Sequence, residues 1–306
     1  MGLKSERWRR TRVIVLYLAP AVLIYGLLFL YPTIDALRIS LYEYGINPAN
    51  AKFIGLGNFV ELIGDRMAHL ALRNNMIIMA IGGFLMLSIA LFFAAALTNR
   101  RIKGKSFFRT VIFFPYMISA AGVGLFWTFV LNPSIGLLNG FLRAVGLGVL
   151  ARPWLGEAGP AMGAIIFVLI WWGIGFYLLF LIAGIESIPV DLLDAARVDG
   201  ASERDVFLKV TLPLLWDHMA VAITLWIIDA LNVFATVMML TKGGPAYKTH
   251  TLSTYMAAVA FKMGGGTGVP LLRFGYGTAI SVALTLLVCM ASGAYFMLRR
   301  REAIEF

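Results

Sequence analysis

Long apolar runs constrain the fold of this chain more than any other feature. Residues 13–31 form a run of 19 residues without a charged side chain, which is the length that a helix needs to cross a membrane. Five further runs meet the same criterion: residues 76–98, 111–131, 161–185, 219–241 and 274–298. Because lipid offers the backbone no hydrogen-bond partners, each run is predicted to be helical. The sequence therefore predicts an all-α, polytopic membrane protein with six transmembrane helices.

Composition supports this class and argues against two others. Hydrophobic residues make up 60% of the 306 positions and charged residues only 14%, so membrane lipid is the expected surrounding. The net charge of +10 would suit nucleic acid, but the basic residues form short clusters between apolar runs instead of a stripe interleaved with aromatic residues. Cys289 is the single cysteine, which excludes an intramolecular disulfide. Neither a nucleic-acid partner nor a secreted, disulfide-linked fold is expected.

The distribution of basic residues predicts the orientation. The N-terminal basic cluster and the run at 13–31 resemble the beginning of a signal peptide, but no small-residue cleavage pattern follows closely, so we expect a retained first span. Alternate connections carry 16 and 10 of the 26 Lys and Arg residues. The richer side is expected to be cytoplasmic, which places both termini there. The predicted division is an N-terminal tail, span and outward loop (1–75), a five-span core (76–298) and a cytoplasmic tail (299–306).

Two outward connections, residues 33–75 and 242–273, are long and contain turn signals such as Gly243-Gly244-Pro245. They are suited to contact with an extracytoplasmic partner. Most outward loops only connect spans, however, so the connecting role is the favoured interpretation and partner contact is the alternative.

A charged segment, residues 185–216, interrupts the apolar runs and contains two consecutive helix signals. Ser187 is placed to cap a first helix that has Pro189 in its opening turn. Asp191 and Asp194 lie three residues apart and share one face of that helix. The first arm of the segment is therefore predicted to be an acidic helix.

A second helix signal follows after Gly200, which can supply the left-handed residue that ends the first helix. Ser202 and Asp205 have the spacing of a capping box, and Pro213 is expected to close the second helix. Its apolar stripe consists of Val206, Phe207 and Val210. Six acidic residues stand against three basic ones across the two arms, a balance that favours a protein partner over anionic lipid.

The spacing of this segment also resembles that of a known family. Asp194-Ala195-Ala196, then three residues, Gly200, nine residues and Val210-Thr211-Leu212-Pro213 resemble the EAA loop of permease subunits in binding-protein-dependent ABC importers. Asp194 replaces the usual Glu and Val210 the usual Ile. The resemblance assigns contact with an ATPase to these residues: Asp191, Asp194, Ala195, Ala196, Asp199, Gly200, Ala201, Ser202, Phe207 and Pro213.

Further motifs resemble the sugar-transporting branch of this family, which includes the maltose and glycerol-3-phosphate permeases. They are Phe108-Arg109-Thr110, Phe114-Pro115, Trp127, Asn132-Pro133, Gly136-Leu137-Leu138-Asn139, Ala183-Gly184 through Ile188-Pro189, Thr241-x-Gly243-Gly244-Pro245 and Phe274-Gly275-Tyr276-Gly277. At Ala235 the branch often carries Asp.

This resemblance implies a type I ABC importer permease fold in a prokaryotic plasma (inner) membrane. It also implies a carbohydrate or polyol substrate, a second and paralogous permease subunit, two ATPase subunits and an extracytoplasmic solute-binding protein. The chain itself is expected to bind no cofactor, with ATP and Mg²⁺ held by the partner ATPase.

Motifs for other chemistry are incomplete. Gly104-Lys105-Ser106 resembles the end of a phosphate-binding loop, but Asn99 occupies the position of the first glycine. The three histidines, His69, His218 and His250, do not form a metal-binding pair, so we expect no metal site. The sequence predicts a transport subunit and not an enzyme.

Asp229 is the main polar anomaly within the predicted spans. A carboxylate at the bilayer centre costs about 2.5–3.5 kcal/mol on insertion scales, so it should face a cavity or a partner. Asn232 and Thr236 follow at the i+3 and i+7 positions of one helix face. This stripe fits contact with a hydroxylated solute, and it equally fits hydrogen bonding between helices.

Further candidates for substrate contact lie in spans three and four. Aromatic faces suit stacking on sugars, but such residues also pack in bundles and at membrane interfaces. The candidates are Tyr116, Ser119, Trp171, Trp172 and Tyr177.

The alternative function is a secondary transporter of a small polar solute driven by an ion gradient. Such a protein is expected to show inverted repeats and discontinuous spans with intramembrane ion ligands, and one isolated Asp229 gives little support for it. A membrane enzyme lacks the reactive groups it would need.

Overall fold

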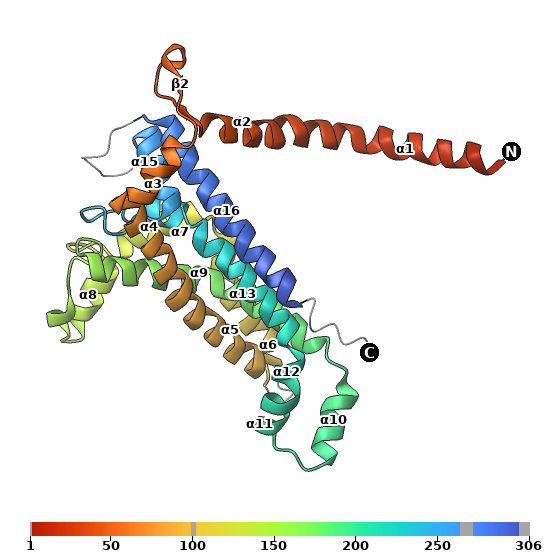
Figure 1. Cartoon of the computed structure of the whole chain (residues 1–306). Coiled ribbons are helices and arrows are strands. Elements are labelled where there is room, and N and C mark those ends of the chain that lie inside the picture. The colour runs from red at the N-terminus through yellow and green to blue at the C-terminus, as the bar shows by residue number, and fades with distance from the viewer. Residues whose placement is uncertain (1, 99–101, 264–271, 300–306) are drawn as a thin grey trace.

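The computed structural model describes residues 2–98, 102–263 and 272–299, which form a mostly helical chain (Figure 1). Its α-helices are α1 Gly2–Tyr25, α2 Tyr31–Ile39, α3 Gly57–Gly64, α4 Arg66–Ile77, α5 Gly83–Thr98, α6 Lys105–Phe113, α7 Ala120–Val130, α8 Leu137–Ala144, α9 Ala158–Glu186, α10 Val190–Val198, α11 Glu203–Asp205, α12 Leu212–Leu214, α13 Trp216–Leu231, α14 Ala235–Leu240, α15 Leu252–Phe261 and α16 Phe274–Arg299. Two short strands, β1 Tyr42–Glu43 and β2 Lys52–Phe53, pair antiparallel. Residues 99–101 of the basic connection, 264–271 of the second outward connection and 300–306 of the tail lie outside the described residues.

Four described helical stretches are long and apolar enough to cross a membrane: Arg12–Ile39, Arg66–Thr98, Ala158–Glu186 and Phe274–Gly293. Two further candidates are bent pairs. Lys105–Met117 meets Ala120–Val130 at 95°, and Glu203–Leu214 meets Trp216–Leu231 at 65°. The count of six spans therefore holds when each bent pair is one span.

The prediction of two continuous helices, at 111–131 and 219–241, was wrong. The first is interrupted at Ile118, after the 3₁₀ turn Phe114–Met117, and Ser119 begins α7 by accepting a hydrogen bond from the Gly122 amide at 3.2 Å. The second ends at Leu231, and residues 232–234 are not helical before α14. Hydropathy measures how apolar a run is and carries no information on where its backbone turns, because buried side chains can satisfy the freed polar groups.

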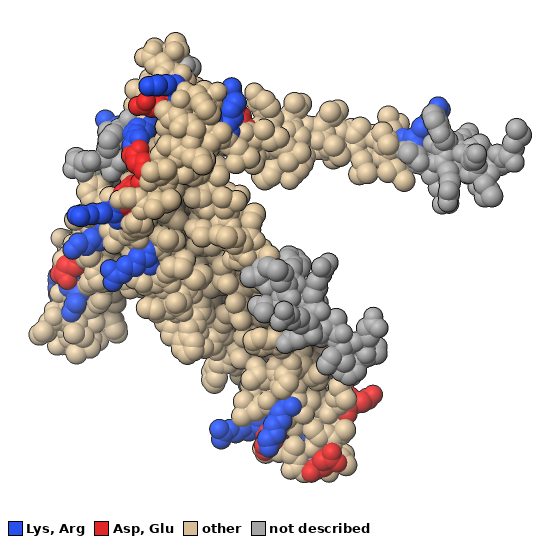
Figure 2. Space-filling view, viewed as in Figure 1, with Lys and Arg blue, Asp and Glu red and all other residues tan. Residues whose placement is uncertain are grey.

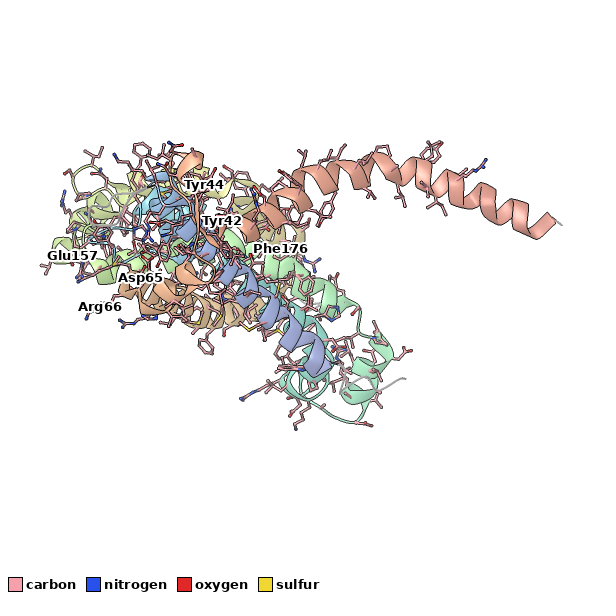
Figure 3. All side chains as sticks on the ribbon, turned by 45° about the horizontal axis from the view of Figure 1, so that its top comes forward. Tyr42, Tyr44, Asp65, Arg66, Glu157 and Phe176 are labelled. Carbon is pink, nitrogen blue, oxygen red and sulfur yellow. The ribbon has the colours of Figure 1, made fainter. Side chains whose placement is uncertain are left out.

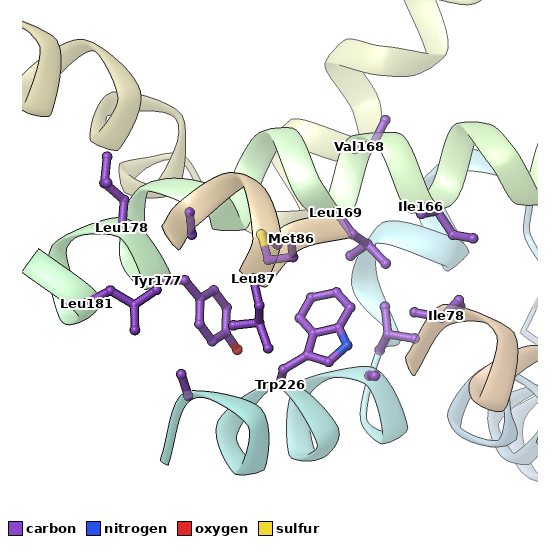
Figure 4. Packing of buried hydrophobic residues seen from close by; sticks show 14 of the residues in the cluster. Ile78, Met86, Leu87, Ile166, Val168, Leu169, Tyr177, Leu178, Leu181 and Trp226 are labelled. Atoms are coloured by element: carbon purple, nitrogen blue, oxygen red, sulfur yellow. The ribbon is translucent and has the colours of Figure 1, made fainter. Parts of the chain in front are cut away.

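The core lies where α5, α9 and α13 cross. Figure 4 shows Met86, Tyr177 and Trp226 from these three helices packed against one another. Trp226 donates its Nε1 hydrogen to the Met79 carbonyl at 2.9 Å, in the π-helical turn Ile78–Gly82 that precedes α5. A Cβ at Gly83 would overlap the Trp226 indole, so this glycine allows the close approach of α5 and α13.

The first span differs from the others because its most apolar stretch is not buried against the rest of the protein. In Figure 1 α1 and α2 project away from the bundle, and no part of the most apolar stretch of Arg12–Ile39 is buried. Large side chains such as Leu16 and Leu28 are 73% and 75% exposed. An apolar surface of this size needs lipid or another protein against it.

Charged side chains gather at two opposite ends of the molecule, with a mainly uncharged belt between them (Figure 2). One end holds α3, α15 and the strands, and the other holds α10–α12 and the C-terminal end of α16 (Figure 1). This distribution fits a membrane-spanning protein. Because α1 projects sideways, the placement of both termini on one side stays a prediction.

Candidate functional site

Residues 185–216, called the coupling segment below, form a projecting helical hairpin as the sequence predicted (Figure 1). Gly200 has φ +83°, a left-handed conformation that glycine adopts without strain. The amides of Asp199 and Ala201 donate to the carbonyls of Ala195 and Ala196, which closes α10 with the expected glycine terminus.

The predicted role of Ser187 was wrong. Its hydroxyl donates to the Gly184 carbonyl at 2.7 Å and so completes the end of α9. Pro189 is the residue that precedes α10, and no side chain caps that helix. Ser187 still has helical backbone angles, so its hydroxyl faces back toward the preceding turn and cannot reach the amides of α10.

The second arm begins as predicted and ends slightly later. Ser202 accepts from the Asp205 amide at 3.2 Å and donates to the Asp205 carboxylate at 2.5 Å. The helix continues through the π turn Val206–Thr211 to Leu214, one residue beyond Pro213. Pro213 cannot donate to the carbonyl four residues earlier, and the chain then bends into α13.

Ion pairs join the two arms of the coupling segment and anchor its base. Arg197 of α10 contacts Asp194 of the same helix at 2.7 Å and Glu203 of α11 at 3.1 Å, and the second of these pairs joins the two arms. At the base, Arg109 of α6 contacts Glu186 at the end of α9 at 2.7 Å. The hairpin is thus fixed within itself and to the neighbouring helix.

A groove of about 690 Å³ lies between the two arms and the ends of α5 and α9. Its wall includes apolar Ile188, Leu193 and Phe207 as well as charged Asp194 and Arg197. Asp191, Ala195 and Asp199 are exposed, while Ala196 and Ala201 are half-buried. The small side chains of α10 leave an accessible, mixed surface that suits a protein partner.

A second cavity, called the pocket below, has a volume of about 340 Å³ and lies beside the break between α13 and α14. Asp229 of α13 accepts a hydrogen bond from the Tyr177 hydroxyl of α9 at 2.8 Å. Figure 4 shows Tyr177 between α9 and α13. The candidates that line the pocket are Tyr116, Trp172, Tyr177, Asp229, Asn232 and Thr236.

Asp229, Asn232 and Thr236 do not form the predicted helical stripe. Asn232 ends α13, with its amide group donating to the Ile228 carbonyl at 2.9 Å, and Thr236 belongs to α14. The three residues meet at the pocket because the chain breaks between the two helices. The spacing argument was therefore wrong although it selected residues of one cavity.

Two further candidates lie elsewhere. Trp171 packs against Trp127 and Phe126 with ring centroids 5.4 Å and 6.4 Å apart. Ser119 caps α7. Neither is among the residues that line the pocket.

Two of the aromatic residues that line the pocket, Tyr116 and Trp172, lie against each other. The Tyr116 ring lies 5.3 Å from both Trp172 and Phe176, measured between centroids. Trp172 donates to the Ile118 carbonyl at 2.9 Å, which fixes its indole at the bend between α6 and α7. Phe176 does not line the pocket, but it supports the Tyr116 ring from outside, and sequence reasoning missed it because it is one of many aromatic residues in an apolar span.

The end that holds α3, α15 and the strands is the one predicted to face outward and is called the outward end below. It contains a polar cluster that no short sequence motif indicated. Asp65 accepts from the hydroxyls of Tyr255 and Tyr276, each at 2.5 Å, and from the Met67 amide at 2.7 Å. Burial acts to raise the pKa of Asp65, but these hydrogen bonds together hold it below its ordinary value. The cluster joins the connection before α4 to α15 and α16.

An ion pair lies beside this cluster. Arg273 binds Glu61 through two contacts of 2.5 Å and 2.6 Å, and this pairing lowers the pKa of Glu61. The Arg273 guanidinium also lies 4.7 Å from the centroid of the Tyr276 ring. Figure 3 shows Asp65 with Tyr42 and Tyr44 at this end of the molecule.

Within the described residues, no group of three or more His, Cys, Asp or Glu side chains could hold a metal ion. His250 is buried, and its ring contacts the Thr254 hydroxyl at 3.2 Å. Gly104 has φ +76° before α6, and Lys105 donates to the Thr98 carbonyl at 3.3 Å. The His250 ring and the Lys105 ammonium group are therefore both hydrogen-bonded within the protein.

Comparison with curated proteins shows relatives along nearly the whole chain. A probable ABC transporter permease of Bacillus subtilis is 35% identical, covering 90% of this chain and 92% of its own. The diacetylchitobiose uptake permease of Streptomyces coelicolor is 33% identical, covering 95% and 83%. The trehalose/maltose permease of Thermococcus litoralis is 30% identical, covering 96% of each.

Solved structures show the same fold. Two crystal structures of a bacterial alginate ABC importer match with TM-scores of 0.83 and 0.82 at 22% identity, covering 97% of this chain and 98% and 96% of theirs. The family described as binding-protein-dependent transport system inner membrane component matches residues 86–303. This range includes the coupling segment and the pocket, and the expected type I permease fold is confirmed. The chain belongs to this family and is a permease component of a binding-protein-dependent ABC importer.

Proposed function

We propose that this chain forms half of the membrane pathway for a carbohydrate or related polyol, with the coupling segment receiving the movement of an ATPase and the pocket contacting the substrate. One observation carries the proposal. The coupling segment directly connects α9 and α13, the two helices that supply Tyr177 and Asp229. Displacement of the hairpin would therefore act on both sides of the pocket, because a rigid helix transmits movement along its length.

The chemistry of the pocket suits a neutral hydroxylated solute. Asp229 and Asn232 offer hydrogen-bond acceptors for hydroxyl groups, and the Tyr116 and Trp172 rings offer apolar faces. The relatives named for diacetylchitobiose and trehalose/maltose uptake support a sugar substrate. The ion-gradient alternative is not favoured by these comparisons.

The partners follow from the exposed surfaces. The unburied first span supports a second permease subunit, for which a paralogous chain is proposed. The acidic hairpin with its groove supports the binding of one ATPase subunit to each permease subunit. The proposed transporter complex therefore contains two ATPase subunits, which bind ATP and Mg²⁺. A solute-binding protein would dock at the outward end, which is supported by the alginate ABC transporter having been solved in complex with an alginate pentasaccharide-bound periplasmic protein. The proposed location is a prokaryotic plasma membrane with both termini cytoplasmic.

Uptake by the complete importer tests this proposal. The complex is purified with its partner subunits, reconstituted in vesicles and supplied with its binding protein and radiolabelled diacetylchitobiose, maltose or trehalose. We expect uptake that requires ATP and persists when ionophores collapse all ion gradients. Uptake that follows an ion gradient without ATP would support the secondary transporter instead.

A further inference from the structure

The break between α13 and α14 leaves backbone carbonyls without helical partners. The last carbonyls of a helix have no intrahelical donor, and a membrane interior supplies no water to replace it. Here the carbonyls concerned are those of Ala230, Leu231 and Val233, and all three residues are buried. Ala230 and Val233 also line the pocket.

Asn75 of α4 satisfies two of these carbonyls. Its side-chain amide donates to Ala230 at 2.7 Å and to Leu231 at 3.2 Å. Its oxygen accepts from the Leu252 amide at 2.9 Å, at the beginning of α15. Asn75 is completely buried, so each of these bonds would be costly to lose.

Two hydroxyl groups satisfy the third carbonyl. Thr251 donates to Val233 at 2.9 Å and Ser253 donates to the same oxygen at 2.7 Å. Thr251 is fully buried and also caps α15. Three side chains from α4 and α15 therefore fix the non-helical stretch beside Asp229 in a single shape.

The neighbouring Asn74 has a different role on the same helix. Its amide donates to the carbonyls of Lys248 and His250 at 2.9 Å and 2.8 Å. These carbonyls belong to the outward connection and not to the helix break. Like Asn75, Asn74 is buried, so the two residues form a matched pair that differs in the backbone they hold.

We propose that Asn75, Thr251 and Ser253 are positioning residues that hold the α13–α14 break in the shape required by the pocket, and that they join this shape to the outward helices α4 and α15. They act through the backbone, since none of them lines the pocket. The proposal rests on the proposed function only in taking the pocket as the place of substrate contact.

Chemical labelling of the pocket tests this without a substrate. Cys289, the only cysteine, is replaced by Ser, and Ala235→Cys places a thiol at the pocket wall. The assembled importer in membranes is treated with a water-soluble methanethiosulfonate reagent. Ser134→Cys, in an exposed turn, reports on general reactivity.

We expect Asn75→Leu to increase the labelling rate at position 235 about tenfold, because two buried hydrogen bonds to the break are lost together. Asn74→Leu should change the rate less than about twofold, since its hydrogen bonds lie elsewhere. Ser253→Ala should raise the rate about threefold, because Thr251 still serves the same carbonyl. The Ser134→Cys rate should stay constant throughout.

An unchanged rate at position 235 in Asn75→Leu, or an equal rise in Asn74→Leu, would overturn the proposal. If Asn75→Leu prevents assembly, the Ser253→Ala variant decides the question: a higher labelling rate at position 235 supports the proposal and an unchanged rate overturns it.

In uptake assays, a positioning role predicts that KM rises more than the maximal rate falls. A purely structural role would lower the amount of assembled complex and leave KM unaltered. A failure of uptake alone would count against the proposed function and not against the labelling result.

Discussion

The coupling segment and the pocket are built in opposite ways. Most of the hairpin is exposed, although Val206, Thr211 and Leu215 are buried. Its arms are held by contacts between residues close in sequence, such as Ser202 with Asp205 and Arg197 with Asp194. The break beside the pocket is buried and is held by Asn75, whose partners are 155 to 177 residues away. We propose that the first region moves as one body, because its two arms are held mainly by each other, whereas the second has a shape imposed by distant parts of the chain.

From this difference we propose a separate task for each region. A surface hairpin with local contacts can dock a partner and shift without unfolding. A buried break with satisfied carbonyls gives a defined cavity within the membrane. Substitutions in the pocket should therefore reduce substrate uptake strongly, whereas substitutions in the hairpin should reduce the coupling of uptake to ATP hydrolysis by smaller factors.

The largest expected effect comes from Asp229→Leu. It leaves the Tyr177 hydroxyl without its partner in the pocket, and the loss of a buried hydrogen bond costs about 1–3 kcal/mol. This cost corresponds to a loss of uptake of roughly 5-fold to 150-fold. Uptake at subsaturating substrate measures it. Asp229→Asn keeps an acceptor and should retain more activity. Equal uptake by wild type and Asp229→Leu would remove the pocket from the pathway.

Gly200→Val should reduce ATP-coupled uptake several-fold. A branched residue at φ +83° costs about 1–2 kcal/mol and distorts the end of α10. Gly146 has φ +80° in a loop outside the coupling segment, with open space around it as at Gly200, so Gly146→Val carries the same strain as a control. Uptake and ATP hydrolysis are measured on both variants. Matching losses would show that the strain itself, and not its place in the hairpin, is responsible.

Acidification should weaken the outward cluster. The pKa values of Asp65 and Glu61 are lowered from 3.8 and 4.5, so their contribution to stability is complete above those ordinary values and is lost as the pH falls through the lowered ones. Thermal unfolding of the complex between pH 7 and pH 3 measures this. Asp65→Asn should be less stable at pH 7 and less sensitive to acid than wild type. An unaltered pH dependence in Asp65→Asn would contradict the assignment.

The smallest effect is expected for Arg197→Gln. Its ion pairs with Asp194 and Glu203 are partly exposed, and such pairs contribute about 0.2–1 kcal/mol each. We expect a decrease in uptake of less than about threefold, with a weaker effect at high salt. A loss as large as that of Gly200→Val would show that Arg197 contacts the ATPase directly.

The sequence predicted those parts of the molecule that depend on local patterns. The apolar runs located the membrane helices, and the glycine terminus at Gly200 and the cap at Ser202 were correct. Ser187 was misassigned because the serine stays within the end of α9. Local spacing does not show which of two adjacent helices a serine hydroxyl will hydrogen-bond to.

The pocket could be predicted only in part. Asp229 was found because a carboxylate in a span is unusual, but its grouping with Thr236 depends on a break that hydropathy does not register. Asn75 lies at the edge of an apolar run, where an Asn is ordinary. Its importance arises from carbonyls that come into reach only after α4, α13 and α15 pack together.

The most direct test of the account compares uptake per ATP hydrolysed in reconstituted importers carrying either Gly200→Val or Asp229→Asn. The account predicts that Gly200→Val lowers uptake per ATP with KM for the sugar unchanged, and that Asp229→Asn raises KM with uptake per ATP retained at saturating sugar. The same change in both variants, or uptake by either one without ATP, would contradict the division of labour between the coupling segment and the pocket.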